Sequence, residues 1–133
     1  MPEDDEKKMT PEQMIALICQ EDGRYSREAY VFLSCSMAFT VKRIGEKRHF
    51  TAAEVVKGIC EFAKLYFGQM ASFVFQVWGI NDTSAIGNMV FNFVDRGYWG
   101  KTEDDKREDF DGVLDLMQEL EDYEIEVPEE NGA

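Results

Sequence analysis

Residues 78–100 read WGINDTSAIGNMVFNFVDRGYWG and contain the clearest structural signals of the chain. Asp82, Thr83 and Ser84 are side chains of the type that accepts hydrogen bonds from free N–H groups at a helix N-terminus. Gly97 suits the left-handed position just past a helix end. Between these two signals, apolar residues recur at the spacing of one helix face, at Ile86, Met89, Val90, Phe93 and Val94. The segment therefore predicts a buried helix.

A strand-like pair and a charged turn follow this helix. Tyr98 and Trp99 have the composition of a β-strand. The next residues, 101–112, read KTEDDKREDFDG, and Phe110 restores an apolar position among them. We therefore expect a small β-hairpin near residues 98–113.

The chain before residue 78 predicts further helices. Two capping boxes, Thr10 with Gln13 and Thr51 with Glu54, mark helix starts because each pair satisfies two free N–H groups. The longest helical pattern runs from Tyr25 to Ile44 and is followed by a glycine. These signals predict a chain that is mostly helical before the hairpin.

Three residues carry expectations about packing. Gly58 lies inside the helix predicted after Thr51, where glycine costs about 1 kcal/mol relative to alanine. Close approach of another helix would explain its presence there. Trp78 and Trp99, the only tryptophans, are expected in the core because burial of large aromatic rings dominates the stability of small domains.

The order of elements predicts a mainly α (α+β) fold, with five to six short helices around one core and a small C-terminal β-hairpin. A buried helix that leads into a glycine, a strand, a charged turn and a return strand also resembles a winged helix. We expect a disordered acidic N-terminus at 1–10, one helical domain at 11–122 and an acidic disordered tail at 123–133. Within the domain, 113–122 fits a helix best, and a strand start is left open.

The net charge of −13 is concentrated at the two ends of the chain. Residues 11–100 carry nine acidic and nine basic side chains, whereas residues 101–133 carry fourteen acidic and three basic ones. Such an acidic third of the chain would repel a phosphate backbone. We therefore consider nucleic acid an improbable partner.

Composition also bears on location and cofactors. No apolar run reaches the roughly 18–20 residues of a membrane span, and the acidic N-terminus does not resemble a signal peptide. The three cysteines form no CxxC pair, which favours buried thiols in a reducing cytoplasm. With a single histidine and no Cys/His cluster, we expect no metal site, and no motif indicates a cofactor.

Two charged regions of the sequence are candidates for binding sites. Six carboxylates lie between Glu103 and Asp111, but they miss the spacing of a calcium-binding EF-hand loop, so a solvated turn is the better interpretation. A basic cluster surrounds the end of the helix that closes at Ile44. The candidate anion or nucleic-acid contacts are Arg43, Lys47, Arg48 and Arg96.

The sequence supports three hypotheses about function. The first is a non-enzymatic protein-interaction or regulatory domain, because catalytic motifs are missing and the body of the chain is neutral. The second is a winged-helix-type nucleic-acid regulator, and the third is a small enzyme that uses His49 with a carboxylate. The residues whose convergence would indicate a functional cluster are Arg48, His49, Asn92 and Asp109. The partner implied by the first hypothesis is a protein, and the oligomeric state is left open.

Short motifs give a resemblance to a known family. They are Arg48-His49 before a capped helix, Trp78-Gly79-Ile80, Gly87 before Val90-Phe91-Asn92, and Glu108-Asp109-Phe110. Together they resemble a family of small uncharacterised proteins best known from planctomycetes and verrucomicrobia, over roughly residues 25–120. The chain departs from that pattern at Ala85-Ile86 and Tyr98-Trp99. The family has no established activity, so the resemblance implies a fold lineage and no particular chemistry.

Overall fold

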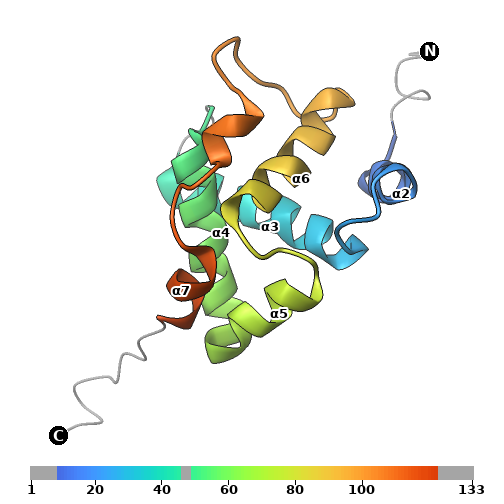
Figure 1. Ribbon diagram of the computed structural model, residues 1–133. Coiled ribbons are helices and arrows are strands. Elements are labelled where there is room, and N and C mark those ends of the chain that lie inside the picture. Colours follow the sequence, from blue (N-terminus) through green and yellow to red (C-terminus); the bar gives the residue numbers. More distant parts are fainter. Residues whose placement is uncertain (1–8, 46–48, 123–133) are drawn as a thin grey trace, which may run out of the picture.

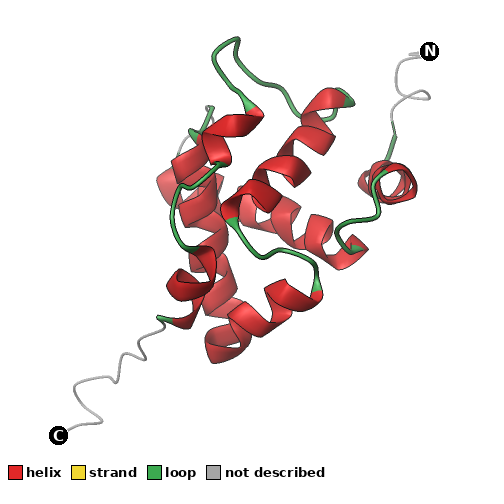
Figure 2. Ribbon diagram, in the orientation of Figure 1, coloured by secondary structure: helices red, strands yellow, loops and turns green. Residues whose placement is uncertain are grey.

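The computed structural model describes residues 9–45 and 49–122, and every regular element in these ranges is a helix (Figures 1 and 2). In chain order the elements are α2 (Pro11–Glu21), α3 (Arg27–Ile44), α4 (Ala52–Phe67), η1 (Gly68–Met70), α5 (Ala71–Val77), α6 (Thr83–Asp95), η2 (Arg107–Phe110) and α7 (Leu116–Glu121), where η marks a 3-10 helix. None of the described helices combines the length and hydrophobicity needed to cross a bilayer.

The helix starts that the sequence predicts are confirmed. Thr10 and Thr51 form capping boxes with Gln13 and Glu54. The Asp82 carboxylate accepts from the backbone N–H of Ala85 at 3.0 Å and caps α6. In each case a side-chain oxygen satisfies an N–H group that has no partner inside the helix.

α3 and α4 form an antiparallel pair whose crossing depends on Gly58. A Cβ atom at this position would lie 2.1 Å from Oγ1 of Thr40, a buried residue of α3. The Thr40 hydroxyl donates to the Ser36 carbonyl oxygen at 2.9 Å, so the side chain is held in place at the contact. The expected close approach of another helix at Gly58 is confirmed.

The core lies where α6 meets α2, α3 and α4, and α5 and α7 pack on α4 beside it. Tyr30 of α3 and Phe93 of α6 are fully buried and meet edge to face, with ring centroids 5.7 Å apart. Burial of such side chains contributes most of the stability of a domain of this size. Other fully buried side chains, from several elements, are Ile18, Leu33, Ile59, Phe75, Ile80, Ile86, Met89, Leu116 and Leu120.

The predicted β-hairpin is wrong, because the end of α6 uses the backbone groups that a strand would need. Gly97 has φ +75°, and its N–H donates to the Val94 carbonyl oxygen at 3.0 Å. The N–H groups of Tyr98 and Trp99 both donate to the Phe93 carbonyl oxygen, at 2.9 and 3.3 Å. This is a Schellman-type helix end. It leaves neither amide free for a β-ladder.

The return segment of the expected hairpin is a 3-10 helix fastened to α6. The Thr83 hydroxyl donates to the Phe110 carbonyl oxygen at 2.5 Å and accepts from the N–H of Val113 at 3.3 Å. The Phe110 side chain packs on Gly87, where an added Cβ would lie 2.6 Å from the Phe110 Cβ and 2.8 Å from the first ring carbon. Residues 98–113 therefore contain no hairpin, and the α+β class and the winged-helix-like arrangement are wrong. Residues 116–121 form a helix, which decides the alternative left open there.

The two tryptophans differ from the expectation that both lie in the core. Trp78 and Trp99 are only half-buried. Trp78 packs on Phe75 with centroids 5.8 Å apart, and Trp99 packs on Phe93 at 4.4 Å. Each ring therefore rests on the core with one side and leaves the other side accessible.

Candidate functional site

A row of polar side chains follows one face of α6 at four-residue spacing: Ser84, Asn88, Asn92 and Arg96. We call these four residues the polar row. At its centre the Asn92 amide donates to the Asp22 carboxylate at 3.0 Å and to the Tyr30 hydroxyl at 2.9 Å. Asn92 thereby connects α6 to the end of α2 and to α3.

The other members of the row have partners on neighbouring elements too. Arg96 donates to the Glu21 carboxylate at 2.6 Å and to the Asn92 side-chain oxygen at 3.1 Å. The Asn88 amide donates to the Tyr25 hydroxyl at 2.8 Å, and the Ser84 hydroxyl donates to the Asp111 carboxylate at 2.6 Å. The row is therefore an internal hydrogen-bond network that holds helices together.

The electrostatics of Asp22 and Tyr30 agree with this structural role. Hydrogen bonds from the Arg24 side chain, followed by one from Asn92, hold the pKa of the Asp22 carboxyl well below its usual range despite partial burial. Burial raises the pKa of the Tyr30 hydroxyl to about 12. The folded state therefore favours an ionised Asp22 and a neutral Tyr30.

The candidate anion contacts are occupied where the structure describes them. Arg96 pairs with Glu21, and Arg43 pairs with Glu61 of α4 and lies over the Phe39 ring at 5.9 Å. Lys47 and Arg48 lie outside the described residues. Both described arginines thus already bind carboxylates of this chain.

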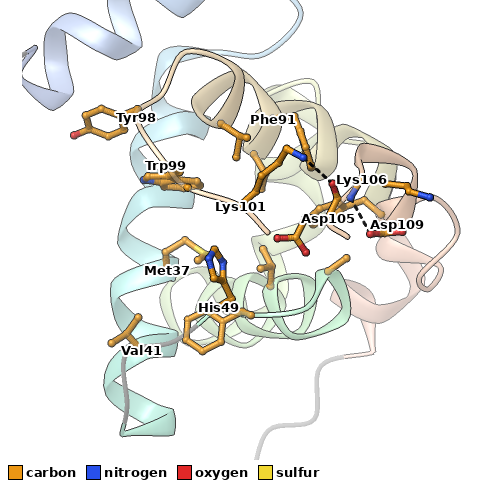
Figure 3. Close-up of a pocket in the computed structure, with 17 residues that line it drawn as sticks. Met37, Val41, His49, Phe91, Tyr98, Trp99, Lys101, Asp105, Lys106 and Asp109 are labelled. Carbon is orange, nitrogen blue, oxygen red and sulfur yellow. Dashed lines mark hydrogen bonds between the residues drawn. The ribbon is translucent and has the colours of Figure 1, made fainter. Parts of the chain in front are cut away.

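A pocket of about 360 Å³ opens where the ends of α3 and α6 meet the start of α4 and the loop after α6 (Figure 3). His49 lines it beside Met37 of α3, and Asp109 lies toward the far side (Figure 3). Asn92 does not line this pocket, and Arg48 lies outside the described residues. The predicted cluster is therefore divided. His49 and Asp109 share a pocket, which leaves the small-enzyme hypothesis a prediction.

Most of the pocket wall is apolar and comes from segments far apart in the sequence. Trp99 forms one wall, fixed by its contact with Phe93, and Phe91 contacts Phe110 edge to face with centroids 6.5 Å apart. The other apolar lining residues are Met37, Val41, Phe50, Ala52, Val55, Val90, Val94 and Tyr98. A cavity of this volume and lining falls at the small end of ligand sites.

Four charged side chains border the pocket: Lys101, Asp105 and Lys106 from the loop after α6, and Asp109 from η2. We call them the charged rim. The Asp105 carboxylate accepts from the N–H of Thr102 at 2.8 Å, and the Asp109 carboxylate accepts from the N–H of Lys106 at 3.0 Å. These bonds fix the backbone turns and so hold the charged side chains at the edge of the pocket.

The sequence did not identify Lys101 and Asp105 as pocket residues. They belong to a charged turn that reads as solvent-exposed, and only the fold brings this turn against an apolar cavity.

A second surface is formed by a segment that contains no charged side chains. Residues 65–81 are 17 successive positions without Asp, Glu, Lys, Arg or His, and they form the end of α4, η1, α5 and the following turn. Five large apolar side chains in this run are more than half exposed: Leu65 (70%), Tyr66 (70%), Met70 (55%), Phe73 (58%) and Val77 (66%). We call these five residues the uncharged face. The end of α4 and α5, which carry these residues, lie at the lower end of the molecule in Figure 1.

An aromatic groove of about 430 Å³ adjoins the uncharged face and shares Tyr66 with it. Its floor includes Phe32 and Trp78, whose ring centroids lie 5.4 Å apart. Val31, on the α3 side, is 44% exposed. The remaining lining residues are Arg27, Glu28, Cys35, Phe62 and Phe67.

The described cysteine, histidine and acidic side chains do not suggest a metal or thiol centre. Within residues 9–45 and 49–122, no three of them come together in a way that could hold a metal ion. Burial raises the pKa of the Cys60 thiol to about 12, which keeps it protonated and unreactive at neutral pH.

Comparison with known proteins finds no protein-family model, no curated protein and no solved structure that matches this chain. The family resemblance of the short motifs therefore stays a prediction. Arguments about function rest on the geometry of the chain itself.

Proposed function

We propose that this protein is a non-enzymatic interaction domain that associates with a second copy of itself through the uncharged face. The observation that carries the proposal is the exposure of five large apolar side chains within 17 uncharged positions. Helices on the surface of a monomer normally turn polar side chains to water, and large exposed apolar patches mark interaction sites.

The exposure of the surface suits a dimer. With Val31 from the neighbouring groove, six large apolar side chains are between 44% and 70% exposed. Five of them belong to α4, η1 and α5, which contact one another. Large apolar side chains exposed on neighbouring elements are the kind of surface from which specific protein interfaces are formed.

The net negative charge of the chain favours binding of a second copy at the uncharged face and opposes binding at its acidic surfaces. Two molecules with a net charge of −13 repel each other wherever acidic surfaces meet. At the uncharged face they bring no like charges together. Interfaces between identical subunits are also more apolar than other protein interfaces, which fits a face without charged side chains.

The test is the molar mass in solution, measured by sedimentation equilibrium over a range of protein concentrations. The wild-type protein should form a dimer, and Phe73→Lys and Val77→Lys should shift it to monomer. Both side chains are more than half exposed, so the substitutions should leave the fold intact. Because lysine reduces the net negative charge, dissociation could not result from greater overall repulsion.

A matched control is Ile44→Lys, which makes the same charge change at an exposed apolar residue near the end of α3. It should leave the dimer intact. A wild-type monomer at about 100 μM, or dimers that persist in both lysine variants, would show that the proposal is wrong.

A further inference from the structure

The pocket beside the loop after α6 combines an apolar interior with a rim that carries both signs of charge. Its volume of about 360 Å³ accommodates one ring or branched aliphatic group and excludes a long lipid chain. Trp99 and Phe91 each contact another aromatic ring, Phe93 and Phe110, so the walls are formed before a ligand enters. Such preorganisation reduces the entropic cost of binding.

The rim charges do not neutralise one another. The ammonium group of Lys101 contacts only the carbonyl oxygens of Thr102 and Asp105, at 3.5 and 3.4 Å, and pairs with no carboxylate among the described residues. Asp105 and Asp109 accept from backbone N–H groups and likewise pair with no described cation. Lys106 points its amine away from the pocket (Figure 3). One cation and two carboxylates thus remain available at the edge of the cavity.

We propose that this pocket binds a small zwitterion with a large apolar group, of the class of free α-amino acids with aromatic or branched aliphatic side chains. The ligand carboxylate would meet Lys101, and its ammonium group would meet Asp105 and Asp109. The apolar side chain would enter the cavity between Trp99 and Phe91. A ligand with only one charge would leave the opposite charge of the rim without a partner. The proposal does not depend on self-association.

The experiment compares four probes that differ by one group each. L-Phenylalanine has all three features, 3-phenylpropionate lacks the ammonium group, phenethylamine lacks the carboxylate, and glycine lacks the apolar group. Titration calorimetry should give L-phenylalanine an affinity at least about tenfold higher than any of the other three, because each missing contact is a charge-assisted hydrogen bond or a buried ring. In a Trp78→Phe background, Trp99 is the sole tryptophan, and its fluorescence should change on binding.

Two variants assign the contacts. Lys101→Met should weaken L-phenylalanine and 3-phenylpropionate about tenfold and leave phenethylamine unchanged. Asp105→Asn should weaken L-phenylalanine and phenethylamine and leave 3-phenylpropionate unchanged, while its carboxamide oxygen still accepts from Thr102. Asp104→Asn, an exposed neighbour that does not line the pocket, is the control and should bind all four probes like the wild type.

The proposal is overturned if no probe binds below about 5 mM. It is also overturned if L-phenylalanine binds no better than 3-phenylpropionate or phenethylamine, or if neither Lys101→Met nor Asp105→Asn changes its affinity. As a control, urea unfolding of each variant should give a midpoint near that of the wild type. A lost affinity then results from the missing charge at the rim and not from unfolding.

Discussion

The polar row of α6 and the charged rim of the pocket both contain ionisable or amide side chains, but their partners differ. In the row, Asn92 and Arg96 bind side chains of α2 and α3. In the rim, Lys101 and Asp105 bind only backbone groups of their own loop. Polar side chains that satisfy one another across helices contribute to stability, whereas unpaired charges beside a cavity remain available to a ligand.

The first and largest prediction concerns the residue that joins the two regions. Phe110 is buried, packs on Gly87 of α6 and belongs to the segment that carries the rim. Phe110→Ala should lower the free energy of unfolding by about 3–5 kcal/mol, since it removes a buried ring and leaves a cavity. Urea unfolding measures this loss. A change below about 1 kcal/mol would mean that the rim segment is held by its hydrogen bonds alone.

The second prediction compares the loss of unfolding free energy caused by a substitution in the polar row with that caused by a substitution in the charged rim. Asn92→Ala should cost about 1–3 kcal/mol of unfolding free energy, because it leaves the buried Tyr30 hydroxyl without this donor and removes one hydrogen bond from Asp22, which keeps those from Arg24. Asp105→Asn should cost under about 1 kcal/mol, because an exposed turn retains its acceptor. Both variants are measured by urea unfolding. Equal losses would remove the distinction between the two regions.

The third and smallest effect is the pH dependence of stability that arises from Asp22, the partner of Asn92 in the polar row. The pKa of Asp22 is lower in the folded state, chiefly through hydrogen bonds from Arg24, than its unfolded value of about 3.9. The stability it contributes is therefore complete above that unfolded value and is lost as the pH falls through the folded pKa. Asp22→Asn should make the urea midpoint fall less steeply below about pH 4 than in the wild type. An unchanged acid dependence would contradict the role assigned to Arg24.

The sequence predicts those features that depend on neighbouring residues. The caps at Thr10, Thr51 and Asp82 require only side chains within three positions, and the left-handed Gly97 follows from its place after a helical pattern. Gly58 predicts a close helix crossing in a similar way. A glycine inside a helix lowers the stability of that helix, and close packing of another helix offsets this cost.

The errors concern residues whose role is set by distant partners. Tyr98 and Trp99 have strand composition, but Phe93 accepts both of their amide protons and packs against both rings. For Asn92 and Arg96 the functional role stays a prediction, and the sequence does not show their partners, Asp22 and Glu21, because these lie some 70 positions earlier. The four-residue spacing of the polar row was visible in the sequence and could have indicated a second, hydrogen-bonded helix interface.

The uncharged run at residues 65–81 also matters before the protein is folded. An apolar stretch of this length without charge is prone to association in an unfolded chain, where Phe75 and Ile80 are not yet covered. Lys64 and Asp82 stand directly at its two ends, the positions at which natural sequences place charged gatekeepers. These two charges flank the residues that later form the uncharged face, and in the folded protein they are used again, because Lys64 pairs with Glu119 and Asp82 caps α6.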